Sequence, residues 1–199
     1  MGFIDLFPTV ILQETLTNLS KETLIKYKNI IQSENLVKDG NNGGYTSNQK
    51  LLEISSFSYL KTQILELSKR YLTEIGHKFQ DVQISSSWGN VLQGGNQIYN
   101  HEHANAYICG AFYLDNSSPI SFQNPHLYNW KFIPESDTNS NKLRKQQEFS
   151  LSPIKNSIIL FPSWLKHRVL TTTQEQRISI AFNIIPKGEF GIDTQKLYL

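Results

Sequence analysis

Two histidines separated by a single residue are the first sign of chemistry in this sequence. His101 and His103 stand in the stretch NHEHANAYICGAFYLD, directly before a run that is typical of a buried strand. Side chains two positions apart on a strand point to the same face, so both imidazoles could approach one ion. The spacing fits equally well two polar residues at the mouth of a strand, and a metal site needs a third donor.

His167 is the obvious candidate for that third donor. It follows the strand-like run SIILFPS and a turn, and it begins the run HRVLTTT, which places it at the edge of a second pair of strands. The two remaining histidines are His77, which follows the helix stop at Gly76, and His126 in the loop NPHLYNW. We expect His77 to be an exposed or capping residue and His126 to be an ordinary loop residue, while a cavity-lining role for His126 stays open.

Arg177 and Ser179 form a second polar pair, in the otherwise apolar run RISIAFNII. Alternation along a strand places both side chains on one face, beside residues that should line a core. A guanidinium there needs an anionic partner. The partner could be an internal Asp or Glu, or it could be a ligand carboxylate that the hydroxyl helps to hold.

Other catalytic chemistry finds no support in the sequence. Cys109 lies inside the apolar run AYICGAFYL, where a cysteine is usually inert packing. The chain has no G-x-S-x-G nucleophile motif, no phosphate-binding G-x-x-x-x-G-K-[ST] loop and no dinucleotide-binding G-x-G-x-x-G motif.

The elements that must position these side chains change in kind along the chain. Ser20 is a predicted N-cap for a helix over SKETLIKYKNIIQSE, and a second helix is predicted over FSYLKTQILELSKRYLTEIG, ending at Gly76. The stretch KDGNNGGYTSNQK between them is predicted to be a surface loop.

From residue 82 the sequence turns to short β-prone runs bounded by turn residues. The runs are VQISSSWGNVL, AYICGAFYL, PISFQN, SIILFPS, HRVLTTT and RISIAFNII. This order predicts a mainly β fold with N-terminal helices (α+β), a sandwich or jelly roll with its helices packed on one sheet. We expect a single domain over 1–199, with a helical part at 1–80, a β core at 82–190 and a polar lid over 126–150.

Composition restricts the classes of protein and partner. The 199 residues are 39% hydrophobic with a net charge of +2, which is ordinary for a globular protein and argues against a nucleic-acid footprint. No run approaches the roughly 20 apolar residues of a membrane span, and the N-terminus lacks the pattern of a signal peptide. The single Cys109 excludes an internal disulfide and suits a cytoplasmic location.

The ordered set H-x-H, H and R-x-S resembles the signature of the Fe(II)- and 2-oxoglutarate-dependent oxygenases. Arg177 follows His167 by ten positions, the usual interval in that superfamily. The blocks HEHANAYICGAFYL, SFQNP, LFPSWLKHRV, RISIAFN and GGYTSNQKLLE are similar to one family of 2-oxoglutarate-Fe(II) oxygenases known from bacteria and their phages.

The resemblance implies a double-stranded β-helix of the cupin-like, jelly-roll type. It assigns Fe(II) to His101, His103 and His167, and the far carboxylate of the co-substrate 2-oxoglutarate to Arg177 and Ser179. A further, weaker match to the nucleic-acid-demethylating branch assigns a 2-oxoglutarate contact to Asn90. The chain departs from the wider superfamily at position 103, where an Asp or Glu is usual.

The function implied is that of a dioxygenase that hydroxylates an unknown substrate and releases succinate and carbon dioxide. A small molecule or a protein side chain could be that substrate, and a homodimer stays open. Two alternatives also stay open. One is a cupin-like three-histidine metalloprotein that does not use 2-oxoglutarate, and the other is a non-catalytic binding module on the same fold.

Overall fold

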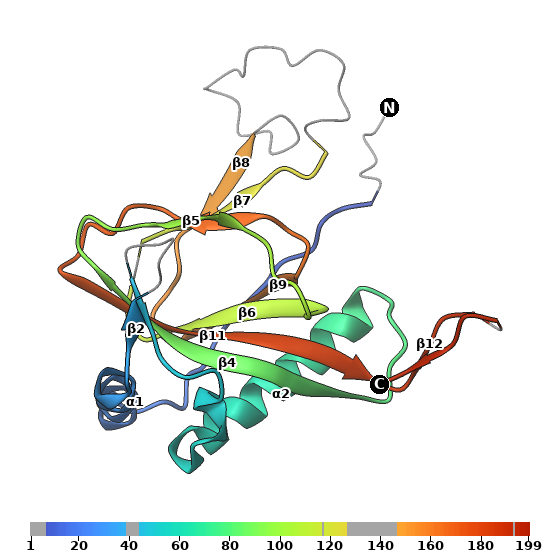
Figure 1. Cartoon of the computed structure of the whole chain (residues 1–199), viewed down its shortest axis with the longest axis horizontal. Coiled ribbons are helices and arrows are strands. Elements are labelled where there is room, and N and C mark those ends of the chain that lie inside the picture. The colour runs from blue at the N-terminus through green and yellow to red at the C-terminus, as the bar shows by residue number, and fades with distance from the viewer. Residues whose placement is uncertain (1–6, 39–43, 117, 127–146, 193) are drawn as a thin grey trace.

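A computed structural model describes residues 7–38, 44–116, 118–126, 147–192 and 194–199 (Figure 1). The helices are α1 (Lys21–Ser33) and α2 (Ser58–Glu74), and two short 3₁₀ turns, η1 (Leu51–Glu53) and η2 (Ser55–Phe57), precede α2. None of the helices in these ranges is both long and apolar enough to cross a membrane.

The strands of the described residues form two large sheets and one hairpin. The major sheet has the order β1 (Leu12–Thr15), β9 (Ser157–Pro162), β6 (Ile108–Tyr113), β11 (Gln176–Lys187), β4 (Asp81–Gln93), β3 (Tyr45–Thr46) and β2 (Val37–Lys38). The minor sheet has the order β5 (Ile98–His101), β10 (His167–Val169), β7 (Ile120–Gln123) and β8 (Glu148–Leu151). The hairpin pairs β12 (Glu189–Phe190) with β13 (Leu197–Tyr198).

The two sheets face each other, and both helices lie on the outer side of the major sheet (Figure 1). Neighbouring strands within each sheet are antiparallel. This arrangement confirms the predicted mainly β, jelly-roll fold of the double-stranded β-helix type, with helices on one sheet. The division into a helical part at 1–80 and a β core at 82–190 stays a prediction.

The local signals for both helices are confirmed. Ser20 caps α1, because its hydroxyl accepts a hydrogen bond of 3.2 Å from the backbone N–H of Thr23. Beyond α2, Gly76 adopts a left-handed φ of +78°, and the N–H of His77 donates back to the carbonyl of Leu72 over 2.9 Å. Glycine is favoured there because a Cβ would strain that backbone conformation.

All six β-prone runs form strands, namely β4, β6, β7, β9, β10 and β11. The prediction of a surface loop over KDGNNGGYTSNQK is wrong where Tyr45–Thr46 forms β3, which pairs with both β2 and β4. Residues 39–43 lie outside the described part. Of the predicted lid, residues 127–146 also lie outside it, while Glu148 onward belongs to β8.

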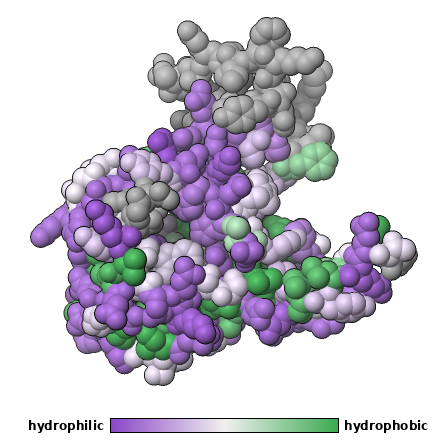
Figure 2. All heavy atoms as spheres, viewed as in Figure 1, coloured by the Kyte–Doolittle hydropathy of each residue, from purple (hydrophilic) through white to green (hydrophobic). Residues whose placement is uncertain are grey.

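The outer face of the major sheet carries the larger apolar core. Leu24, Tyr27 and Ile31 of α1 and the buried face of α2 pack against it together with residues of β11. Burying one such side chain is worth about 1.5–3 kcal/mol. Figure 2 shows hydrophobic residues on one surface of the molecule as separate patches among hydrophilic ones.

Strand β11 is buried on both faces, with opposite chemistry on the two. Ile178, Ile180, Phe182 and Ile184 belong to the core beneath the helices. The alternate residues Arg177, Ser179, Ala181 and Asn183 are also buried, and all four line a cavity between the sheets. The fold therefore uses one face of its central strand for packing and the other for a site.

Candidate metal and co-substrate site

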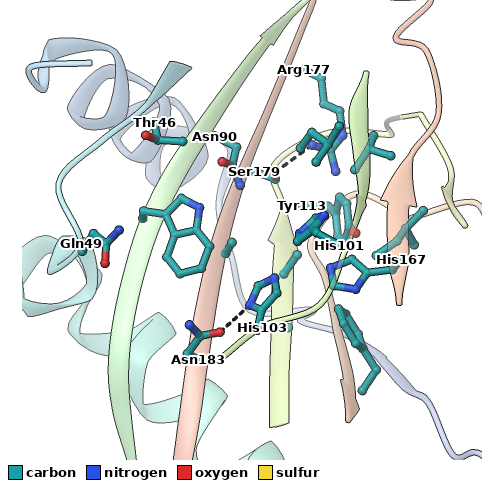
Figure 3. A pocket seen from close by; sticks show the side chains of 18 of the residues that line it. Thr46, Gln49, Asn90, His101, His103, Tyr113, His167, Arg177, Ser179 and Asn183 are labelled. Carbon is teal, nitrogen blue, oxygen red and sulfur yellow. Dashed lines mark hydrogen bonds between the residues drawn. The ribbon is translucent and has the colours of Figure 1, made fainter. Parts of the chain in front are cut away.

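Three histidines lie close together at one end of strands β5 and β10 of the minor sheet. His101 ends β5 and His167 begins β10, and these two residues are partners in the ladder between the strands. One potential ligand atom from each of His101, His103 and His167 lies within 4.8 Å of the others. Figure 3 shows the three rings side by side in the cavity. The spacing suits one ion bound by three imidazoles.

The hydrogen bonds of the three rings leave the same nitrogen free in each. The Nδ1 atoms lie 2.8 Å from the carbonyl of Tyr99 for His101, and 2.9 Å from the carbonyl of Leu165 for His167. The Nδ1 atom of His103 lies 2.6 Å from the side-chain oxygen of Asn183. Because each partner is an oxygen that accepts, each Nδ1 carries the proton and each Nε2 keeps its lone pair for a metal.

Burial keeps two of these rings neutral. It lowers the pKa of His167 to about 3, an effect that the charge of nearby His101 increases. Burial also lowers the pKa of His103, although the hydrogen bond with Asn183 opposes that shift. A neutral imidazole is the metal-binding form, so these rings need not lose a proton at neutral pH before they bind an ion.

The expectation that His101 and His103 share one strand is wrong in detail. His103 lies beyond the end of β5, and its backbone N–H donates to the carbonyl of Ser163 over 3.0 Å. This bond to the chain after β9 turns His103 toward the other two rings. Glu102 between them is exposed and does not line the cavity.

Arg177 and Ser179 meet at the other end of the cavity. Arg177 Nη1 donates to Ser179 Oγ over 3.1 Å, and only 2% of the arginine is exposed. No carboxylate forms an ion pair with this guanidinium within the described ranges, and its Nε atom is buried without a hydrogen-bond partner. Among the described residues, the internal Asp or Glu that the sequence allowed is therefore not in ion-pair contact with Arg177, although the charge of Asp115 opposes the fall in the pKa of the guanidinium that burial causes.

Tyr113 is a third polar side chain at this end, and sequence reasoning missed it. Its ring centroid lies 5.4 Å from Arg177 Cζ, and its hydroxyl is buried with no hydrogen-bond partner. Burial raises the pKa of this hydroxyl although the neighbouring guanidinium of Arg177 opposes the shift, so the hydroxyl keeps its proton and can donate. Tyr113 pairs with Ser179 across β6 and β11, which brings both side chains to the same face. Only this strand register reveals that Tyr113 faces the site. In the sequence, a tyrosine within an apolar run is typical of a core residue.

Small side chains create the space between the two ends. Ala111 and Ala181 are direct partners in the β6–β11 ladder and form part of the wall of a cavity of about 500 Å³. Asn90 on β4, the partner of Ser179, lines it too, as does Trp88, whose ring centroid is 5.8 Å from that of His103. A ligand held by Arg177 can therefore extend toward the histidines.

The other candidate residues from the sequence lie elsewhere. Cys109 is fully buried, and burial raises the pKa of its thiol, which fits inert packing. His126 is exposed and is not among the cavity-lining residues. His77 is also exposed, and its Nδ1 lies 2.8 Å from the Tyr107 hydroxyl, away from the three-histidine cluster.

In this jelly roll, three histidines offer a set of nitrogen ligands for a metal ion, and a buried arginine in the same cavity offers a cationic group for an anion. Residues 86–183 match the family described as "Putative 2OG-Fe(II) oxygenase". The match runs from within β4 to within β11 and covers just under half of the chain.

Solved structures share the fold at low identity. HygX from Streptomyces hygroscopicus, with nickel and 2-oxoglutarate bound, is 13% identical with a TM-score of 0.62, over 89% of this chain and 83% of that one. A Pseudomonas putida prolyl-4-hydroxylase is 11% identical with a TM-score of 0.62, and the match covers 90% of this chain and 94% of that one. A Trichoplax adhaerens prolyl hydroxylase in complex with a hypoxia inducible factor peptide is 14% identical with a TM-score of 0.63, over 88% and 83%. No curated protein matches the sequence.

Proposed function

We propose that this chain uses Fe(II) and 2-oxoglutarate to hydroxylate a C–H bond of a small molecule or a protein side chain. Succinate and carbon dioxide would be the co-products. One observation carries the proposal: the three-histidine cluster lines the same cavity as an arginine that, among the described residues, forms no ion pair with a carboxylate. An iron ligand set and a binding site for a dicarboxylate are the two parts that this reaction requires.

The donor set fits Fe(II). His101, His103 and His167 would present three Nε2 atoms from one side, which leaves the remaining coordination positions to the co-substrate and to oxygen. When bound, iron supplies the oxygen chemistry that couples oxidation of 2-oxoglutarate to oxidation of the substrate. The protein's own contribution is to fix the three rings and to exclude water.

The opposite end of the cavity fits the far carboxylate of 2-oxoglutarate. Arg177 would hold it through guanidinium N–H groups, since Nε has no partner and one Nη1 bond already joins Ser179. Ser179 and Tyr113 would each donate a hydroxyl, and Asn90 lies on the adjacent strand in line with Ser179. Burial of the arginine strengthens its interaction with an anion, because little water competes there.

The remaining wall of the cavity indicates the charge of the substrate. Lys38, Thr46, Gln49 and Trp88 line it, and none of the described residues that line the cavity is an Asp or Glu. We therefore propose a neutral or anionic substrate group over a cationic one. Proteins of related fold hold both a small molecule and a peptide, since HygX has been crystallised with hygromycin B and the Trichoplax enzyme with a peptide fragment.

Location and assembly are further proposals. A single cysteine, buried and unpaired, suits the reducing cytoplasm. The near-neutral net charge of +2 argues against nucleic acid as the substrate. A homodimer stays open.

His103 favours one second candidate function. A carboxylate at this position would partly neutralise the ion, whereas a third neutral imidazole leaves its full charge, which suits other metal-dependent reactions as well. In that case the protein would be a cupin-like three-histidine metalloprotein that does not use 2-oxoglutarate, and Arg177 would bind a different anion. A non-catalytic binding module is the third candidate.

One titration separates the three candidates. Purified protein is loaded with Fe(II) without oxygen, 2-oxoglutarate is added, and the visible metal-to-ligand charge-transfer band is followed. A saturable band supports the proposal. Normal iron binding without the band would favour the three-histidine metalloprotein, and failure to bind either iron or 2-oxoglutarate would leave the binding module.

A further inference from the structure

We infer that Asn183 is the positioning residue that makes His103 a metal ligand. The inference rests on the proposed three-histidine site. Asn183 Oδ1 lies 2.6 Å from His103 Nδ1, and the asparagine is only 9% exposed on the inner face of β11. Figure 3 shows this contact at the edge of the cavity, with the rest of the His103 ring turned toward His101 and His167.

The chemistry of a neutral imidazole explains why this contact matters. Such a ring carries one proton and has one lone pair, and they lie on different nitrogens. An amide oxygen can only accept, so it places the proton on Nδ1 and frees Nε2 for the ion. His101 and His167 reach the same state through backbone carbonyls, which no substitution removes. His103 alone among the three depends on a side chain.

The amide of Asn183 is itself held in place. Its Nδ2 donates to Ser86 Oγ over 3.0 Å, which directs the oxygen toward His103. Ser86 is the partner of Asn183 in the β4–β11 ladder, and the register shifts just after it, so that Ser85 is an extra residue in β4. Bulges of this kind redirect side chains beside functional sites. The bulge therefore lies directly beside Asn183, whose side chain contacts the His103 ring.

A testable coupling follows from this arrangement. A carboxylate at position 103 would be ionised at neutral pH and would have a lone pair ready for the ion without any partner to set a tautomer. The His103→Asp variant should therefore bind metal without help from Asn183. In the native chain, by contrast, loss of the amide oxygen frees the ring to place its proton on Nε2, where it blocks the metal.

Co(II) serves as the probe, since it binds nitrogen ligands, reports its coordination by visible absorption and is stable in air. Metal-free full-length protein is titrated with Co(II), and the ring ¹⁵N shifts of His103 are recorded before metal is added. Asn183→Leu should weaken Co(II) binding about 10–100-fold and lose the pure Nδ1–H tautomer. Asn183→Asp keeps the acceptor and should bind Co(II) at least as tightly as the native chain. Asn29→Leu, the same change at an exposed position of α1 outside the cavity lining, should alter neither the Co(II) affinity nor the tautomer.

Two comparisons decide the outcome. In a His103→Asp background, adding Asn183→Leu should leave Co(II) affinity unchanged, and an equal loss in both backgrounds would overturn the inference.

Should Asn183→Leu fail to fold, Asn183→Asp and Ser86→Ala provide the test. A native tautomer in Asn183→Asp and a mixed tautomer in Ser86→Ala support the role, and any other tautomer pattern overturns it. If His103→Ala leaves Co(II) affinity intact, the ligand set of the proposed function fails. If His103→Ala weakens binding and Asn183→Leu does not, only the role of Asn183 fails.

Discussion

Strand β11 has two buried faces. Burial of the outer face lowers the free energy of folding, and burial of the inner face raises it. On the outer face, Ile178, Ile180 and Phe182 pack beneath the helices and gain stability from burial. On the inner face, Arg177 is buried with an Nε that has no hydrogen-bond partner, and the nearby Tyr113 hydroxyl has none either. A buried polar group without a partner costs about 1–3 kcal/mol. One face therefore stabilises the sheet, while the other is held in an unfavourable state until a ligand arrives.

The difference teaches where substitutions should act. Changes on the outer face should lower the free energy of unfolding and leave ligand affinity in the folded protein unchanged. Changes on the inner face should reduce ligand affinity and leave the free energy of unfolding equal or higher, as is common where function requires local instability.

The largest expected effect is loss of the metal through His167→Ala. The ring is one of the three proposed ligands, and changes at residues that merely support a ligand already cost about 10–100-fold in affinity. Binding of Fe(II) under anaerobic conditions should fall below detection in a calorimetric titration. His126→Ala, a histidine on the surface and away from the cavity, should bind iron normally. Iron binding retained in His167→Ala would contradict the assigned site.

On the outer face, Phe182→Ala should lower the free energy of unfolding by about 3–5 kcal/mol, because it leaves a cavity in a closely packed core. The ring occupies space that only a glycine opposite it allows: a Cβ on Gly110 would lie 2.7 Å from Phe182 Cζ. Urea unfolding measures the loss. The affinity of the folded fraction for 2-oxoglutarate should stay native, and a parallel fall in that affinity would show that the two faces are not independent.

Arg177→Met tests the inner face with a side chain of similar length and no charge. The variant should bind 2-oxoglutarate about 2–5 kcal/mol more weakly, while its iron affinity is unchanged. Without ligand it should be more stable than the native chain by about 1–4 kcal/mol, because the change removes a buried charge that forms no ion pair with any described carboxylate. Calorimetry and urea unfolding give the two quantities. A lower free energy of unfolding in the ligand-free variant would contradict the proposed difference between the two faces.

The smallest expected effect is that of Tyr113→Phe, which removes one buried hydroxyl. Affinity for 2-oxoglutarate should fall by about 0.5–1.5 kcal/mol, the usual net contribution of a hydrogen bond. The free energy of unfolding without ligand should rise by about 1 kcal/mol, since the hydroxyl has no partner to lose. Affinity equal to that of the native protein would remove Tyr113 from the co-substrate site.

Much of the fold could be predicted because its central strands carry strong local patterns. The runs that form β6, β9 and β11 are apolar, bounded by turn residues and long enough to recognise. The strands that sequence reasoning missed are short, and their residues are polar or mixed, as in LQET of β1 and IYNH of β5. Their pairing depends on backbone hydrogen bonds with distant strands, and no local pattern of side chains reports it.

The same distinction applies to the site. His101, His167 and Arg177 could be found because histidines and an arginine beside buried strands are unusual. Asn183 was overlooked within RISIAFNII, although the alternation that joins Arg177 to Ser179 continues to it. Tyr113 could not be singled out, because its role depends on facing Arg177 across two strands that are distant in sequence.

The position of β11 in the sheet also has a consequence for synthesis of the chain. It lies between β6 and β4 in space, yet it follows both in sequence by many residues. Until the ribosome has released residues 176–187, those two strands each have an edge with no neighbour, and such edges invite pairing with other chains. All three histidines of the proposed metal site emerge earlier than this strand, but Asn183 and Arg177 of the proposed anion site do not. A nascent chain can therefore complete its site only when its last long strand enters the middle of the sheet.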